Sequence, residues 1–240
     1  MATPRIVRTI ESDSLPAIDP ANGASYNGQL IFSSSYLSGT GTEPWITSGN
    51  VAIPLADIIT GANVLGPYGY QAVGDTVFFW DSQGLPNAEQ ALWRTDGTTA
   101  GTKPVSTIDE SSPLRASSSP YYFWRYTQQV GWEPWKSDGT ASGTGLLKDI
   151  AAGSASSQPE LGDAAFNLDF SINEKQFFAA DDKENGVELW VTDGTGANTK
   201  LLLDINPGAS GSNPRFVGKI GTEVFFAAND GIHGDELWRS

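Results

Sequence analysis

The side chains able to do chemistry in this sequence are mainly carboxylates and aromatic rings. The chain has 28 Asp and Glu residues and eight Trp, but a single His, His233, and no Cys. Without Cys there is no thiol nucleophile, thiolate metal site or disulfide, and a Ser–His pair would have to use His233. The chemistry left open is cation binding or glycoside hydrolysis by carboxylates, and recognition of a ligand by aromatic rings.

The net negative charge argues against nucleic acids and anionic membranes as partners. The chain carries 14 Lys and Arg against 28 acidic residues, a net charge of −14, and such a surface repels phosphate backbones and anionic lipids. No apolar run approaches the ~18 residues that cross a bilayer, and the opening residues contain no signal-peptide core. We expect no nucleic-acid partner, no membrane insertion and no cofactor, in a protein that is cytoplasmic or whose leader lies outside this sequence.

Five of the Trp residues recur in one sequence context and define a repeat. The intervals between them are 48, 42, 55 and 48 residues, so five units account for the 240 residues. A period of this size with one Trp per unit is typical of propeller blades or a solenoid. These anchor residues are Trp45, Trp93, Trp135, Trp190 and Trp238.

The content of each unit favours a propeller. An Asp-Gly-Thr turn follows three of the anchors, at 96–98, 138–140 and 193–195, and then come a short apolar run, a Gly/Ser/Pro loop and two more strand-like runs. No segment has a helical period. Each unit therefore predicts four short antiparallel strands, the content of one blade.

The last unit is incomplete, which suggests how the repeat closes. Its strands are expected at about 215–220, 223–229 and 235–240, and the sequence stops before a fourth. Residues 4–10 match residues 200–205 in pattern and can supply that strand, which would remove two free sheet edges. We predict a single all-β domain, residues 1–240: a five-bladed β-propeller of four-stranded antiparallel blades, the last made of 213–240 plus the N-terminal strand 4–10.

The repeat resembles a known family. Glu188-Leu189-Trp190 through Asp193-Gly194-Thr195 matches the ELWxxDGT repeat of bacterial, often secreted or surface, proteins. The other units depart from it, for example at Ala91 and Pro134. The resemblance implies an extracellular or cell-surface location and no particular chemistry. In blade number and size the predicted ring is also similar to the five-bladed lectin propellers of the tachylectin type, a likeness of architecture alone.

The repeated residues are explained by the fold. We expect the anchor Trp residues to be buried between blades and the Asp-Gly-Thr segments to be turns. The carboxylate-rich loops 181–186 and 229–235 are the better cation candidates, with solvated Asx turns as the favoured interpretation. His233 is expected to be a surface or turn-bonding residue, with a ligand contact as the alternative.

Residues that break the template are the candidates for ligand binding. Three Trp lie outside the anchors, in the second and third units, and polar or aromatic residues flank them. We expect the first two Trp to be partly exposed in a groove between blades 2 and 3; the alternative is that they fill this groove. The candidate site is Trp80, Asp81, Trp124, Arg125, Tyr126 and Trp132, with no catalytic and no metal-binding residue.

These observations favour a non-enzymatic binding module, most concretely a lectin-like module for a glycan or a small neutral ligand. The alternative is a structural or protein–protein interaction module of a secreted or cell-surface assembly. A glycosidase-like hydrolase ranks third, because no pair of carboxylates stands out from the acids of the turns.

Overall fold

The structure is a computed structural model, and every regular element in the residues it describes is a β-strand. These residues are 18–35, 41–58, 66–81, 90–108, 110–113, 120–157 and 170–240. No helix in this part of the chain is long and apolar enough to cross a membrane. The chain divides into two compact units, Met1–Asp109 and Glu110–Ser240, each of which is described by itself.

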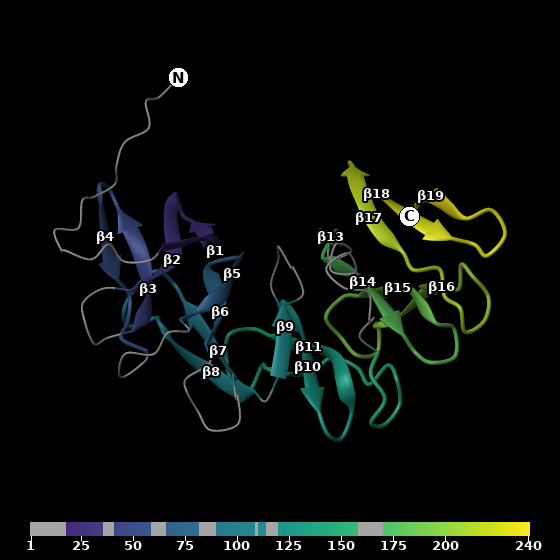
Figure 1. The fold of residues 1–240 in the computed structure, drawn as a ribbon, viewed down its shortest axis with the longest axis horizontal. Helices are drawn as coiled ribbons and strands as arrows, with labels where there is room; N and C mark the ends of the chain where they lie inside the picture. The colour runs from purple at the N-terminus through teal and green to yellow at the C-terminus, as the bar shows by residue number, and fades with distance from the viewer. Residues whose placement is uncertain are drawn as a thin grey trace. The chain divides into compact units, whose positions relative to one another are not determined.

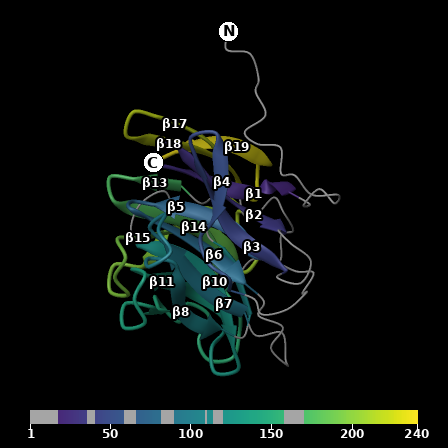
Figure 2. The same cartoon turned by 90° about the vertical axis from the view of Figure 1, so that its left-hand side faces the viewer.

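The first unit holds two four-stranded antiparallel sheets in which consecutive strands pair (Figures 1 and 2). The strands of the first sheet are β1 (Ile18–Tyr26), β2 (Gln29–Ser35), β3 (Thr42–Ser48) and β4 (Val51–Pro54). Those of the second are β5 (Tyr68–Val73), β6 (Thr76–Asp81), β7 (Gln90–Thr95) and β8 (Lys103–Ile108).

The second unit holds two four-stranded sheets and one three-stranded sheet (Figure 1). The third sheet is β9 (Glu110–Pro113), β10 (Tyr121–Thr127), β11 (Gly131–Ser137) and β12 (Gly145–Leu146). The fourth is β13 (Phe170–Ile172), β14 (Lys175–Asp181), β15 (Val187–Thr192) and β16 (Lys200–Leu203). The last is β17 (Arg215–Ile220), β18 (Glu223–Asn229) and β19 (Asp235–Arg239).

The predicted all-β repeat is confirmed. Each anchor Trp lies on the third strand of its sheet, and the three strands expected in the last unit match β17, β18 and β19. The sheet they form has no fourth strand among the described residues. The strand predicted at 4–10 lies outside the described residues. The predicted closure of a ring by this strand is therefore not tested.

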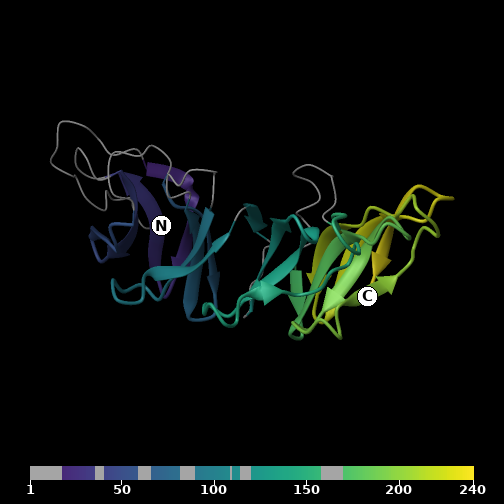
Figure 3. The ribbon, with the colours of Figure 1, turned by 90° about the horizontal axis from the view of Figure 1, so that it is seen from below.

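Apolar cores join consecutive sheets within each unit. In the second unit, Phe177, Leu189 and Val191 of the fourth sheet pack against Val224 and Phe226 of the last, the two sheets coloured green and yellow in Figure 3. This packing follows from the period of two along each strand, which sends alternate side chains to opposite faces. The third and fourth sheets share a second core in the same way, around Trp124, Phe178 and Trp190.

The anchor Trp residues are only partly equivalent. Trp45, Trp93 and Trp190 are buried as predicted, whereas Trp135 and Trp238 are half-buried. The guanidinium of Arg125 lies 4.4 Å from the centroid of the Trp135 ring. Trp238 packs against the core that the last sheet shares with the fourth.

The Asp-Gly-Thr segments form closed loops rather than two-residue turns. In each, the Asp Oδ1 accepts the main-chain N–H of the Thr two residues on, and the Gly has a positive φ between 83 and 89°. Hydroxyl pairs 2.7 Å apart then join the two ends of the loops, at Thr95–Thr102, Ser137–Thr144 and Thr192–Thr199. The predicted turn role of these carboxylates is confirmed.

Candidate functional site

The repeat Glu two positions before the anchor Trp is a buried structural carboxylate in the third and fourth sheets. Glu133 and Glu188 are 0% exposed. Glu133 accepts the N–H groups of residues 17 and 18 positions further along the chain, Ile150 and Ala151, and the hydroxyl of Ser157, 24 positions on. Glu188 accepts the same set at the same spacings, from Ile205, Asn206 and Ser212.

The same interaction occurs in the first sheet, where Glu43 accepts the N–H of Ile58 at 2.7 Å. Burial raises the pKa of Glu133 and Glu188 above the ordinary value, although the donated hydrogen bonds act in the opposite direction. We call this arrangement the carboxylate clamp, defined by the repeat Glu and the N–H of the Ile that ends the fourth strand or follows it. The clamp holds the chain as it leaves one sheet for the next.

In the second sheet, the acidic residue of the clamp position lies on the second strand instead of the third. Ala91 stands where the other sheets have Glu, and its cross-strand neighbour is Asp81. The corresponding pairs in the fourth and last sheets are Ala180 with Glu188 and Ala228 with Glu236. Asp81 is 0% exposed, so the buried carboxylate of this sheet comes from the second strand instead of the third. Asp81, predicted as a ligand contact, occupies a structural position of the repeat.

The expectation that Trp80 and Trp124 are partly exposed is wrong. Trp80 is 0% exposed and Trp124 2% exposed. Trp80 lies over Gly69, where a Cβ atom would come within 3.1 Å of the indole. Trp124 packs edge-on against Phe178, with ring centroids 6.1 Å apart. Both rings fill space inside their own units.

Two of the six predicted residues, Tyr126 and Trp132, form a ring pair in the second unit. Tyr126 and Trp132 face each other across the β10–β11 hairpin, with ring centroids 6.0 Å apart and an interplanar angle of 53°. Both are half-buried, and the adjoining turn exposes Gln128 and Gln129. Arg125 is on the same strand as Tyr126, but its guanidinium covers Trp135.

The loop at 151–157 contacts the main chain of the strand that carries Trp132. The N–H of Trp132 donates to Ser156 Oγ at 3.0 Å, and the Trp132 carbonyl accepts the N–H of Ser157 at 2.9 Å. Gly131 has no side chain where a Cβ would lie 2.2 Å from the Ala155 carbonyl oxygen. The loop therefore fixes the main chain of Trp132. Aromatic rings near exposed amide side chains are suited to binding a neutral ligand.

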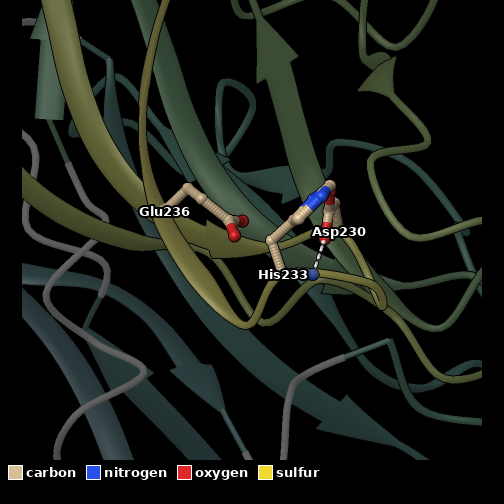
Figure 4. Close-up of side chains that lie close together, drawn as sticks. All are labelled: Asp230, His233 and Glu236. Carbon is tan, nitrogen blue, oxygen red and sulfur yellow. Dashed lines mark hydrogen bonds and ion pairs between the residues drawn. The ribbon is translucent and has the colours of Figure 1, made fainter.

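The loop between β18 and β19 brings together the only cluster of potential metal ligands found among the described residues. Asp230, His233 and Glu236 each offer an atom within 4.8 Å of the others (Figure 4). Asp230 is already occupied: it accepts the N–H groups of Ile232 and His233 and pairs with His233 Nδ1, each at 2.8 Å. Asp182 makes the equivalent turn with Glu184 and Asn185. The favoured interpretation of these loops as Asx turns, and of His233 as a turn-bonding residue, is confirmed.

Comparison with known proteins gives the fold and no family. No protein-family model matches the chain, and a search of curated proteins finds no similar sequence. Two solved structures are similar in fold. The β-propeller domain of the Trilobed protease from Pyrococcus furiosus, described as having an open velcro topology, is 8% identical, with a TM-score of 0.52 over 95% of this chain and 69% of that one. Puromycin hydrolase is 12% identical, with a TM-score of 0.52, and this chain spans only 37% of its length.

These likenesses show that the five sheets match those of propeller domains. At such low identity they say nothing of activity.

Proposed function

We propose that this chain is a non-enzymatic binding module of the lectin type, with Tyr126 and Trp132 as its sugar-stacking surface. The observation that carries the proposal is the half-buried aromatic pair at the end of the β10–β11 hairpin. A sugar presents C–H groups on one face of its ring, which pack on an aromatic face, and hydroxyls at its edge. The exposed amides of Gln128 and Gln129 can donate to these hydroxyls and accept from them.

The roles of the carboxylates support binding rather than hydrolysis. Glycoside hydrolysis needs an acid and a base or nucleophile about 5–10 Å apart beside the bound sugar. In the described part of the chain, Glu133 and Glu188 are saturated by main-chain donors. Asp138 and Asp193 close their loops. These acids stabilise the fold and are not available to a substrate.

A glycan array followed by calorimetric titration of the bound glycans tests the proposal. Trp132→Ala and Tyr126→Ala should each weaken binding about tenfold or more, since stacking on one ring is worth about 1–3 kcal/mol. Trp132→Phe keeps a ring and should retain part of the affinity. Trp238→Phe, in another sheet, is the matched control and should bind as the wild type does.

Unchanged binding by both alanine variants, or no glycan bound at all, would refute the proposed site. Release of a shorter sugar during the titration, detected by NMR, would refute the non-enzymatic assignment.

The second candidate is a structural or protein–protein interaction module. It is favoured by aliphatic side chains that the last sheet leaves in solvent, with Val217 60% exposed and Leu237 66% exposed. Association that rises with protein concentration and is lost in Leu237→Ser, measured by light scattering, would favour this function. A monomer at all concentrations would count against it.

We also propose that the five sheets belong to one propeller whose last blade is completed by residues 4–10, and that the chain is an ELWxxDGT-repeat protein. The three-stranded last sheet and its exposed aliphatic face support the first part. The structural use of all three motif elements supports the second: a clamping Glu, a core Trp and a closed Asp-Gly-Thr loop.

A further inference from the structure

The turn between β18 and β19 uses the two oxygens of Asp230 in different ways. Asp230 Oδ1 accepts the N–H groups of Ile232 and His233, each at 2.8 Å, and these two bonds close the turn. Asp230 Oδ2 takes no part in them and lies 2.8 Å from Nδ1 of the His233 ring. One oxygen therefore builds the turn, and the other faces the single imidazole of the chain.

Glu236, on the strand that follows the turn, adds a second carboxylate. Figure 4 shows this carboxylate directed toward His233. Glu236 Oε2 is buried and has no hydrogen-bond partner among the described residues. A buried carboxylate oxygen without a donor is costly, because the charge has left water and nothing replaces the lost hydrogen bonds. A cation beside this oxygen would supply the missing compensation.

The fourth sheet contains the same turn without these features. Asp182 Oδ1 accepts the N–H groups of Glu184 and Asn185, and Asp182 Oδ2 accepts the side-chain amide of Asn185 at 2.8 Å. Glu188, which corresponds to Glu236, is bonded to the donors of the carboxylate clamp. The turn of the last sheet differs in two respects: an imidazole replaces the amide, and the following Glu keeps an oxygen without a donor.

An imidazole nitrogen with two carboxylate oxygens is a ligand set for a divalent transition metal such as Zn²⁺. Ca²⁺ and Mg²⁺ prefer oxygen ligands alone. Asp230, His233 and Glu236 each offer a ligand atom within 4.8 Å of the others, and ligands of one Zn²⁺ lie about 3.4 Å apart at tetrahedral angles. The His233 side chain is 69% exposed, so its ring has room to turn and close this difference.

We propose that Asp230, His233 and Glu236 form a binding site for a divalent transition-metal ion of the Zn²⁺ type. Its ligands are Asp230 Oδ2, a ring nitrogen of His233 and the carboxylate of Glu236, and water completes the coordination because the turn is open to solvent. The net charge of −14 favours the approach of a cation. The site uses residues of the last sheet alone, so it does not depend on the proposed sugar-stacking surface.

NMR titration of the full chain with Zn²⁺ tests the proposal, on protein without an affinity tag and in a buffer without phosphate. Because His233 is the only His, its imidazole signals report on the site without overlap. These signals should shift and reach saturation at one equivalent of Zn²⁺. A large excess of Mg²⁺ should leave them in the Zn²⁺-bound position, since Mg²⁺ prefers oxygen ligands.

Calorimetric titration of variants with Zn²⁺ tests the ligands one by one. His233→Ala and Glu236→Gln should each weaken binding about tenfold or more, since even groups that only orient a metal ligand are worth about 10–100-fold in affinity. Asp182→Asn changes the equivalent turn of the fourth sheet and is the matched control, expected to bind as the wild type does. Thermal unfolding of each metal-free variant shows that it is folded.

Asn185→His tests whether the oxygen of Glu236 is needed. This variant places an imidazole beside Asp182, but Glu188 stays bonded to its main-chain donors. The variant should therefore bind a single equivalent of Zn²⁺, as the wild type does. A second equivalent bound with similar affinity would overturn the assignment of Glu236 as a ligand.

Three results would overturn the site as a whole. The first is a titration of the His233 signals that does not saturate, and the second is complete displacement of Zn²⁺ by Mg²⁺. Either would show diffuse association of cations with an acidic surface. The third is an unchanged affinity in His233→Ala, which would place the bound ion elsewhere on the chain.

Discussion

Glu188 and Glu236 occupy equivalent positions in the fourth and last sheets. Their surroundings differ. Glu188 accepts two N–H groups and a hydroxyl and is fully buried. Glu236 is half-buried and keeps one oxygen without a donor among the described residues. The repeat template fixes the residue, and the neighbouring chain decides whether its charge is compensated.

Glu188→Gln should lower the free energy of unfolding by about 2–3 kcal/mol. The amide keeps the size of the side chain but replaces one charged acceptor with a donor that faces other donors, and hydrogen bonds to charged groups contribute about 1.5–3 kcal/mol. Urea unfolding followed by Trp fluorescence measures the change. Glu223→Gln is the exposed control, expected within about 0.5 kcal/mol of wild type; equal effects of the two variants would contradict the clamp role.

Trp190→Ala should cost about 3–5 kcal/mol, the range for deleting a large buried side chain. Trp190 packs with Trp124, Phe178 and Ala180, and its Nε1 has no hydrogen-bond partner in the described chain, so the loss is one of packing. Val217→Ala, at a solvent-exposed position, is the control, expected near zero. A loss under about 1 kcal/mol for Trp190→Ala would show that this ring is not part of the core.

The pKa of His233 should lie above 6.5 and fall toward that value in Asp230→Asn. The hydrogen bond that the His233 ring donates to Asp230, and then the charge of Asp230, raise the pKa of His233. The bonds donated by His233 and Ile232 lower the pKa of Asp230 to about 2. Because His233 is raised in the folded state, its stabilising effect is complete below pH 6.5 and is lost as the pH rises through the folded pKa.

The effect of Asp230 has the opposite dependence, present above its unfolded value of 3.8 and lost as the pH falls through about 2. NMR titration follows the single imidazole of the chain without overlap. A midpoint that does not move in Asp230→Asn would contradict the pairing.

The errors of sequence interpretation also belong to single residues. Trp80 and Trp124 depart from the small residues of the template, and this departure predicts a ligand site that their burial contradicts. A substitution shows that the space differs, but its neighbours decide whether the new side chain is exposed. Phe178, which covers Trp124, lies 54 positions further along the chain. The position of the acidic residue in the second sheet could be found by aligning the units. Ala91 replaces the repeat Glu on the third strand, and Asp81 replaces a small residue on the second.

At the scale of elements, sequence interpretation was accurate because the signals are local. The boundaries of β17, β18 and β19 match the predicted ranges to within one residue, since alternation and turn residues mark both ends of each strand. The size of the Asp-Gly-Thr loops was missed. They close through a hydroxyl pair seven residues apart, a contact that the turn residues alone do not reveal.

Replacing two glycines of positive φ should separate the cost of the backbone conformation from the cost of a steric contact. Gly194 has a φ of 89°, and a Cβ there would lie 3.0 Å from Tyr122 Oη, whereas Gly153 has a φ of 78° and open space. Gly153→Ala should cost about 1–2 kcal/mol from the backbone alone, and Gly194→Ala should cost more. Thermal unfolding of both variants measures the difference; equal losses would mean that the approach of Tyr122 places no demand on this loop.

At the scale of the whole molecule, the repeat predicted a propeller, and the similarity to solved propeller domains confirms that fold. The closure of a ring was inferred from pattern matching between the two ends of the sequence and stays a prediction. Local propensity cannot decide it, because pairing between distant segments depends on the entropy of closing the chain as well as on the strands themselves.

The charge of −14 should make stability depend on salt. Repulsion among the acidic groups opposes the compact state, and the Debye length falls from about 30 Å at 0.01 M to about 8 Å at 0.15 M. Tm should therefore rise across this range, by about 2–4 °C for each kcal/mol of repulsion relieved. An unchanged Tm would contradict this expectation. Buffers matched for osmolality with sucrose give the control.

The position of the clamp donors, downstream of their Glu in the same copy of the repeat, bears on how such a chain can change its length over evolution. Glu133 and Glu188 both bind donors 17, 18 and 24 positions downstream, so each copy of the repeat encodes both the acceptor and the donors that compensate it. A duplicated copy inserted in frame arrives with its buried charge already satisfied and requires no second mutation elsewhere. Gain or loss of whole repeats is thereby tolerated, and the 15-residue spacing of Glu43 and Ile58 shows that the clamp also forms across a connection two residues shorter.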